Sequence, residues 1–155
     1  MAYNPLYTYK AKTPVLLGGT HSQFSTDADE TSPTWHNLIG CVELGDVGDI
    51  AETVECTTID DDRKMYCGGL KDSQDKELTM YFYDGDEDQA ALIAAAEAGQ
   101  EVTFKHQYTN GNIMTYSLRL MGWQILSGTA DGFMQMKVTG KVSSSTTHSK
   151  ATTTP

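Results

Sequence analysis

Two turn signals in the last third of the chain constrain its fold more than any other feature. Asn110-Gly111 separates "EVTFKHQY" (101–108) from "IMTYSLRLMGWQIL" (113–126), and Asp131-Gly132 separates the latter from "FMQMKVTGKV" (133–142). Asn-Gly and Asp-Gly between alternating apolar and polar residues are typical of β-hairpins, and Asn-Gly favours a type I′ turn. The sequence therefore predicts an antiparallel three-stranded meander.

The long middle strand of this meander contains an irregularity. Tyr116, Leu118 and Leu120 share one face, whereas beyond Gly122 the apolar positions shift by one residue. A glycine at such a shift in phase predicts a bulge or a sharp bend.

Further elements are predicted upstream of the meander. The strand patterns cover residues 35–44, 50–58 and 77–83, and the last two alternate apolar and polar side chains. One helix is predicted over residues 86–100, where Asp86 can cap the first turn and Gly99 can end the last. Leu92, Ile93 and Ala96 share the helix face that would pack on a sheet. We expect a mainly β fold, an antiparallel β-sandwich or barrel with one flanking α-helix.

The 155 residues suffice for one domain with terminal extensions. Residues 1–34 contain several prolines and glycines without a sustained period, so we expect an N-terminal arm. Residues 35–143 form the expected β-sandwich domain. Residues 144–155 are rich in Ser and Thr and are expected to form a flexible tail.

The charge of the chain excludes several function classes. The protein has 21 acidic and 11 basic residues, a net charge of −10, and no Lys or Arg between Lys12 and Arg63. Proteins that hold nucleic acid or anionic membranes neutralise phosphates with Lys and Arg, so stable binding of either is not expected.

Cysteine usage and the absence of an export signal point to one compartment. The three cysteines include no C-x-x-C pair, and neither an apolar leader nor a bilayer-spanning apolar run is present. These features predict reduced thiols and folding in a cytoplasm.

No cluster of residues predicts catalysis or a cofactor. The run Asp60-Asp61-Asp62 lacks the alternate ligand spacing of a calcium loop, and it is expected to be a solvated turn. The four histidines are scattered, and His106 is expected to be a hydrogen-bonded histidine of the core or of an interface. There is no nucleophile or phosphate-loop motif. The eight tyrosines and seven methionines mostly alternate with polar residues, so packing in a core or subunit interface is favoured over a ligand pocket.

The order of the elements carries a resemblance. An acidic "TTIDDD" turn, then "CGGLKD", then a helix beginning near Asp86, and a closing "LSGTADGFMQMKVTGKV" strand pair follow one another along the chain. Over roughly residues 35–143 this order resembles that of the tail tube (major tail) proteins of long-tailed, non-contractile bacteriophages.

The resemblance implies a structural protein of the virion tail, assembled in the host bacterial cytoplasm. Such proteins self-assemble into stacked hexameric rings that form a hollow tube, with strands of neighbouring subunits joined into an inner barrel. An N-terminal arm, a long loop and in some members a C-terminal extension contact the next ring. Tape-measure, tail terminator and baseplate or initiator proteins are the implied partners. DNA is transient cargo, and no cofactor, catalysis or membrane binding is expected. A further immunoglobulin-like domain, and host-surface binding by it, is not expected.

The resemblance also suggests roles for individual residues. An acidic wall would repel DNA and let it slide, because like charges about 4 Å apart repel by roughly 1 kcal/mol in water. The strand over residues 51–58 would then be a barrel wall, wet on one face and apolar on the other. The candidates for the lumen or its rim are Glu43, Glu52, Glu55, Asp60, Asp61 and Asp62. Those for inter-ring contact by the arm are Tyr7, Tyr9, Leu16 and Leu17.

Two other functions compete with the tube subunit. One is a monomeric or dimeric β-sandwich binding module that uses its Tyr- and Met-rich face, and a more distant one is a hydrolase with paired acids. A related architecture, the secreted hexameric tube of a bacterial injection system, is also compatible with the sequence.

Overall fold

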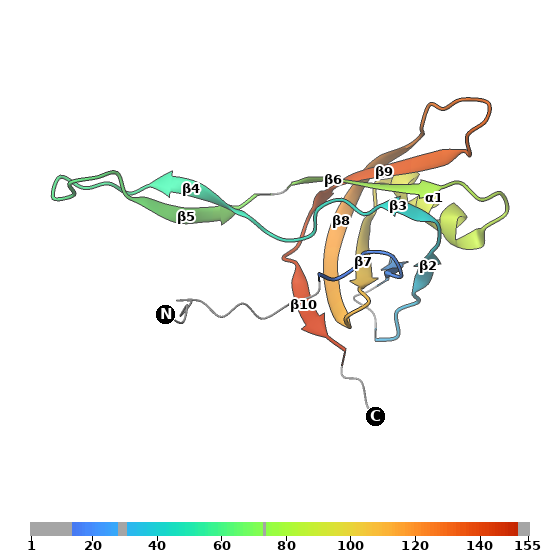
Figure 1. Ribbon diagram of the computed structural model, residues 1–155, viewed down its shortest axis with the longest axis horizontal. Helices are drawn as coiled ribbons and strands as arrows, with labels where there is room; N and C mark the ends of the chain where they lie inside the picture. The colour runs from blue at the N-terminus through green and yellow to red at the C-terminus, as the bar shows by residue number, and fades with distance from the viewer. Residues whose placement is uncertain (1–13, 28–30, 73, 152–155) are drawn as a thin grey trace, which may run out of the picture.

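The computed structural model describes residues 14–27, 31–72 and 74–151. These residues form a mainly β, antiparallel structure with a single helix, as predicted (Figure 1). The strands are β1 (His21–Ser25), β2 (His36–Leu38), β3 (Cys41–Glu43), β4 (Ala51–Glu55), β5 (Tyr66–Lys71), β6 (Asp75–Tyr81), β7 (Glu101–Gln107), β8 (Asn112–Ile125), β9 (Gln135–Val142) and β10 (Thr147–Lys150), and the helix is α1 (Glu87–Ala98).

The main sheet must curl because its two edges are consecutive in sequence. Its strand order is β2-β1-β7-β8-β9-β6-β3, with β10 beside β8. Only Ile39 and Gly40 separate β2 from β3 at the opposite edges, and three peptide steps span at most about 11 Å. Gly40 has φ +68°, and a Cβ there would lie 2.5 Å from the Tyr83 hydroxyl oxygen, so this crossing requires glycine. The single strand predicted over residues 35–44 is therefore wrong, since two strands with different partners occupy it.

The first hairpin of the meander is present, but its turn differs from the prediction. The Gly111 N–H donates to the Tyr108 carbonyl oxygen (3.0 Å), and the Tyr108 N–H donates to that of Asn112 (2.9 Å). Gly111 has φ +86°, whereas no described non-glycine residue has a positive φ. A type I′ turn needs positive φ at both central residues, so that part of the prediction is wrong. The three-residue loop is of the kind that ends in a left-handed glycine.

The irregularity in β8 is confirmed. Leu120 pairs with Gly140 and Gly122 pairs with Thr139, so one residue of β8 is unmatched between them. The strand that follows begins at Gln135, and Asp131-Gly132 lies within the loop that precedes it. The register shift lets the long strand bend around the core.

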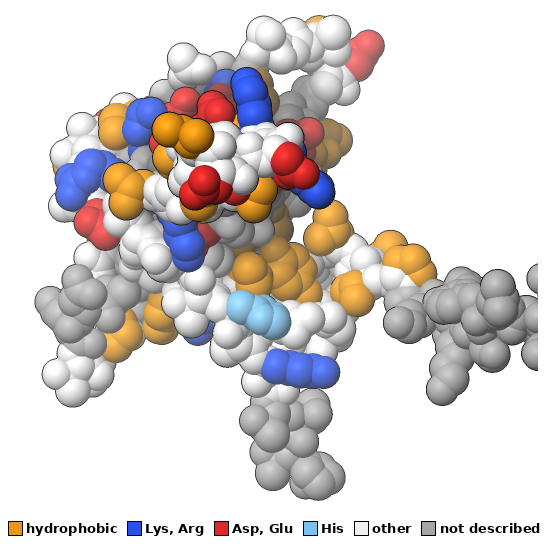
Figure 2. All heavy atoms as spheres, turned by 90° about the vertical axis from the view of Figure 1, so that its left-hand side faces the viewer, with side chains coloured by type: hydrophobic (Ala, Val, Ile, Leu, Met, Phe, Trp, Pro, Cys, Tyr) orange, Lys and Arg blue, Asp and Glu red, His pale blue; other side chains and the backbone are white. Residues whose placement is uncertain are grey.

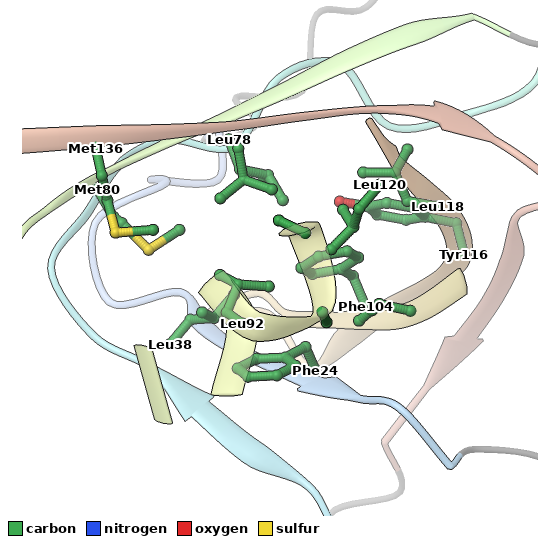
Figure 3. Close-up of a cluster of buried hydrophobic side chains, with 14 residues drawn as sticks. Phe24, Leu38, Leu78, Met80, Leu92, Phe104, Tyr116, Leu118, Leu120 and Met136 are labelled. Atoms are coloured by element: carbon green, nitrogen blue, oxygen red, sulfur yellow. The ribbon is translucent and has the colours of Figure 1, made fainter. Parts of the chain in front are cut away.

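The helix follows its predicted signals closely. The Asp86 side chain accepts a hydrogen bond from the Asp88 N–H, and Gly99 ends the helix with φ +67°. Leu92 and Ala96 are buried as predicted, while Ile93 is only partly buried against the core. Figure 3 shows Leu92 of the helix in one cluster with buried side chains of the main sheet, such as Phe24 of β1 and Met80 of β6. The fully buried apolar residues include Phe24, Leu78, Met80, Leu92, Val102, Phe104, Leu118, Met136 and Val138.

Two segments predicted to lack regular structure contain strands of the main sheet. Phe24 of β1 is fully buried and pairs with Phe104 of β7. The prediction of an N-terminal arm over residues 1–34 is therefore wrong for residues 21–25, which belong to the main sheet. Thr147–Lys150 pairs with residues 112–115 of β8, so the prediction of a flexible tail over residues 144–155 is wrong for these four residues. Residues 1–13 and 152–155 lie outside the described part of the chain.

Candidate assembly surfaces

A two-stranded hairpin projects from one end of the molecule. β4 and β5 pair with each other in a separate antiparallel sheet and extend away from the body (Figure 1). Every residue of β4 is exposed in the single chain, so the barrel wall that this strand would form with neighbouring subunits stays a prediction. Isolated two-stranded hairpins are marginally stable in water. The hairpin therefore needs support from within itself or from a neighbour.

Internal support comes from a disulfide bond between Cys56 and Cys67. The strand register places Val54 opposite Cys67, so Cys56 lies on the same face and one step diagonal to its partner. Their Cα atoms are 6.2 Å apart, within the range that a disulfide requires. The expectation of reduced thiols is wrong for this pair, because it considered sequence spacing and not cross-strand register. Cys41 is free, and burial raises the pKa of its thiol to about 11.

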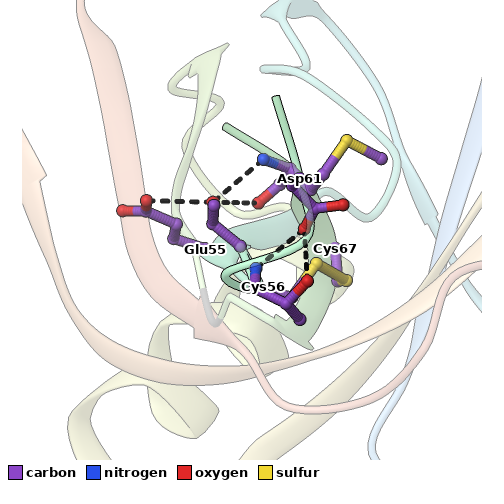
Figure 4. The surroundings of a disulfide bond; sticks show 7 residues. Glu55, Cys56, Asp61 and Cys67 are labelled. Atoms are coloured by element: carbon purple, nitrogen blue, oxygen red, sulfur yellow. Dashed lines mark hydrogen bonds between the residues drawn. A yellow bond between two sulfur atoms is a disulfide. The ribbon is translucent and has the colours of Figure 1, made fainter. Parts of the chain in front are cut away.

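The aspartate run forms the solvated turn that the sequence predicts. It lies in the loop between β4 and β5, where the Thr58 N–H donates to Asp61 Oδ2 (2.7 Å) and the Asp61 N–H donates to the Thr58 carbonyl oxygen (3.2 Å). Figure 4 shows the hydrogen bonds of this loop together with the Cys56–Cys67 disulfide. Asp61 is thus occupied within the loop, and no group of three metal-ligating side chains occurs among the described residues.

The six acidic lumen candidates are all exposed, but they do not lie on one wall. Glu43 lies in β3 at the edge of the main sheet, whereas the other five lie on the hairpin or its tip. Residues 50–72 hold six acidic and three basic residues. Figure 2, which faces the hairpin, shows acidic, basic and apolar side chains mixed on this end.

The hairpin also exposes large apolar side chains. Ile59 at the tip is fully exposed and Leu70 of β5 is 84% exposed, with Ile50 and Tyr66 also exposed. A scattered apolar residue on a surface needs no explanation, but several on one thin hairpin leave an apolar surface that a partner could bury.

A second apolar surface lies at the opposite end of the main sheet. It is a groove of about 640 Å³ lined by Tyr81, Phe82, Tyr83, Phe133 and Met134, where β6 ends and the loop before β9 begins. Phe133 is 85% exposed and its ring meets that of Tyr81 edge to face, with centroids 6.3 Å apart. We call this the aromatic groove. The sequence favours packing of the methionines in a core or a subunit interface, and the exposure of Met134 fits the second of these.

The arm candidates are only partly described. Leu16 and Leu17 are exposed, and Leu17 borders a groove of about 520 Å³ that also contacts β3. Tyr7 and Tyr9 lie outside the described residues.

The buried polar residues form a structural network. His106 is fully buried, as predicted; its Nδ1 lies 2.7 Å from Ser22 Oγ and its Nε2 lies 2.8 Å from the Tyr116 hydroxyl oxygen. Burial lowers the pKa of His106 to about 4, so the ring is neutral at pH 7. The Lys76 ammonium lies over the Tyr116 ring and donates to the Asp46 carbonyl oxygen, and burial lowers its pKa to about 8. These contacts join β1, β6, β7 and β8, so the network helps to hold these strands together.

Comparison with known proteins identifies the family. The sequence model of the phage tail tube protein family matches residues 15–147, most of the chain. The chain belongs to the phage tail tube protein family. It is therefore a structural, tube-forming protein of a phage tail. No curated protein matches the sequence.

Solved structures support the fold of this tail tube protein. The SPP1 tail tube protein is 16% identical with a TM-score of 0.68, covering 89% of this chain and 80% of that one. A protein of the gene transfer agent tail is 15% identical with a TM-score of 0.61, covering 82% and 94%. A protein of the anti-feeding prophage baseplate is 10% identical with a TM-score of 0.69, covering 90% and 98%. At these identities the likeness concerns the fold alone.

In the described part of the tail tube protein, no helix is long and apolar enough to cross a bilayer.

Proposed function

We propose that this tail tube protein assembles with itself into stacked hexameric rings, and that phage DNA passes through their hollow centre during ejection. The observation that carries the proposal is the projecting hairpin, whose two strands pair only with each other among the described residues and whose apolar side chains are exposed. A surface of this kind is stabilised when a neighbouring subunit covers it. The similar gene transfer agent tail has C6 symmetry, which supports rings of six.

The acidic residues give the channel its proposed electrostatic character. We propose that Glu43, the hairpin glutamates Glu52 and Glu55, and the turn of Asp60, Asp61 and Asp62 face the bore or its rim. All six are exposed in the single chain, and Arg63, 3.8 Å from Asp62, offsets part of the charge of that carboxylate. Repulsion of phosphates prevents stable binding and lets DNA slide, in keeping with the net charge of −10. Nothing in this role requires catalysis or a cofactor.

Other tail components complete the proposed assembly. The exposed Leu16 and Leu17, together with Tyr7 and Tyr9, would contact the adjacent ring. A tape-measure protein, a tail terminator and a baseplate or initiator complex would set the length and the ends of the tube. The likeness to a protein of the anti-feeding prophage baseplate favours a second candidate, the tube of an injection system. This candidate would yield rings without long spontaneous tubes.

Light scattering and electron microscopy test the proposal. Purified protein at rising concentration, with and without an initiator complex, should give hollow rods built from rings. Leu70→Ser should leave the fold intact and reduce the fraction of protein in rods, whereas the control Leu70→Met keeps an apolar side chain and should assemble like the wild type. A protein that stays a compact monomer under every condition, initiator included, would favour the binding-module alternative and refute the tube.

A further inference from the structure

The direction of the hairpin needs an explanation, because the segment that enters it from the body is short and contains two glycines. The chain enters β4 through Gly45 and Gly48, which have φ of +69° and +141°. It leaves β5 at Lys71, and the next residue, Asp72, donates its N–H to the Ile50 carbonyl oxygen (3.1 Å). That bond closes the root of the hairpin, but it joins the two strands to each other and not to the body.

Asp49 connects this root to a distant part of the chain. Its Oδ2 accepts a hydrogen bond from the Thr146 N–H (2.8 Å), and its Oδ1 accepts one from the Thr146 hydroxyl (3.1 Å). Lys71, at the other side of the root, approaches the same Oδ2 at 3.4 Å. The Asp49 side chain is only 12% exposed, so water competes weakly for these bonds. The Thr146 backbone N–H lowers the pKa of Asp49, with a smaller contribution from Lys71.

The partner of Asp49 is itself fixed on the body. The Ser143 N–H donates to the Ser117 carbonyl oxygen (2.9 Å), so the chain before Thr146 lies along β8. β10 then pairs with β8, and the Ala151 N–H donates to the Gly111 carbonyl oxygen (2.8 Å). Thr146 lies between these two attachments. A carboxylate bound to it is therefore held relative to the main sheet, although 97 residues separate the two in sequence.

We propose that Asp49 is a positioning residue that sets the direction of the hairpin by binding it to the C-terminal segment 143–151. This inference rests on the proposed function for its purpose, because identical copies must present their hairpins at the same angle to build a regular tube. A hairpin held in one direction before assembly loses less conformational freedom when a neighbour binds it. The C-terminal segment acts as a clamp, and its removal would release the hairpin.

A purely local role for Asp49 accounts for less of the geometry. An aspartate that only stabilises its own turn bonds to backbone groups a few residues away. Both carboxylate oxygens of Asp49 instead accept hydrogen bonds from Thr146, in the segment between β9 and β10. The contact with Lys71 also connects Asp49 to β5, the second strand of the hairpin. Lys76 holds the preceding loop through the Asp46 carbonyl oxygen, so the chain is already fixed up to the glycine that precedes Asp49.

Hydrogen–deuterium exchange on unassembled subunits tests the inference directly. In the Asp49→Ala variant, exchange at the Thr146 amide and in peptides 50–72 should rise roughly tenfold or more, the effect of losing hydrogen bonds to a charged acceptor. Thr146→Val removes only the hydroxyl donor and should give a smaller rise. The double variant should exceed Asp49→Ala by little, because both changes break one interaction. Asp72→Ala is the matched control, since this exposed carboxylate of the same root forms no side-chain hydrogen bond among the described residues.

Assembly supplies the second measurement. Tubes of the wild type should elongate faster than those of Asp49→Ala at equal concentration, while Asp72→Ala should match the wild type. Unchanged exchange in Asp49→Ala, an equal rise in Asp72→Ala, or additive effects in the double variant would overturn the clamp. Raised exchange with unchanged elongation would overturn its role in assembly. Absence of wild-type tubes would contradict the proposed function while the exchange result still decides the clamp.

Discussion

Replacement of both hairpin cysteines tests how the projecting structure is stabilised. The Cys56–Cys67 bond closes a segment with a sequence separation of 11. In the chain-entropy account, a closed loop of that length contributes about 3 kcal/mol. Among the described strands β4 and β5 pair only with each other, so the loss in Cys56→Ser/Cys67→Ser should fall on the hairpin. At 1.4 kcal/mol for each factor of ten, hairpin opening should rise roughly 100-fold.

The assay separates the hairpin from the body. Hydrogen exchange in peptides covering residues 51–71 should accelerate, whereas the amides of β7, β8 and β9 should keep their protection and the melting temperature should change little. Reduction of the wild-type protein by dithiothreitol provides a second route to the same state, without any change of sequence. A fall of several degrees in melting temperature with unchanged hairpin exchange would refute the reasoning, since it would mean that the hairpin is coupled to the global fold.

Three further predictions concern the body of the protein. Gly140→Ala should cost about 1–3 kcal/mol of unfolding free energy in denaturant titrations, because its Cβ would lie 2.6 Å from the Arg119 carbonyl oxygen; the control Gly128→Ala, with open space around it, should stay within about 0.5 kcal/mol. Leu118→Ala should cost about 2–5 kcal/mol in the same titration, because Leu118 is fully buried. His106 has a pKa of about 4 when folded, below its unfolded value, so the unfolded state binds more protons between pH 4 and 6.5. Stability should therefore fall on acidification through this window, and thermal melts of His106→Gln should show a smaller fall.

The elements that the sequence predicts well are those whose signals are local. The helix has its cap, its acidic first turn and its terminal glycine within fifteen residues, and each of these acts on neighbouring backbone groups. The β7–β8 hairpin is equally local. Its turn type was mispredicted because Asn-Gly is compatible with more than one hairpin loop, and the choice depends on how the flanking strands pair.

The elements that the sequence misses depend on distant partners. β1 is five residues long, and its Phe24 is buried because the strand pairs with β7, about 80 residues away in sequence. β10 is polar and exposed throughout, so no apolar pattern marks it, and backbone hydrogen bonds to β8 define it. The disulfide has the same origin, since cross-strand register and not spacing brings Cys56 to Cys67.

Some apolar positions of regular strand patterns are exposed in the single chain. Alternation around Val54 predicts a strand with one buried face, yet the single chain leaves this residue exposed, and Met134 behaves in the same manner. Alternation of apolar and polar residues in a strand predicts which side chains are buried in the functional state. For a tube subunit, the functional state includes its neighbouring subunits. Apolar residues that follow a strand pattern but are exposed in the single chain therefore indicate surfaces that other copies cover. By this reasoning the hairpin and the aromatic groove, at opposite ends of the main sheet, are the two surfaces to vary first. Contact between two unlike surfaces is a heterologous interface, and the rotation between neighbouring subunits decides whether it closes into a ring or continues as an open helical assembly.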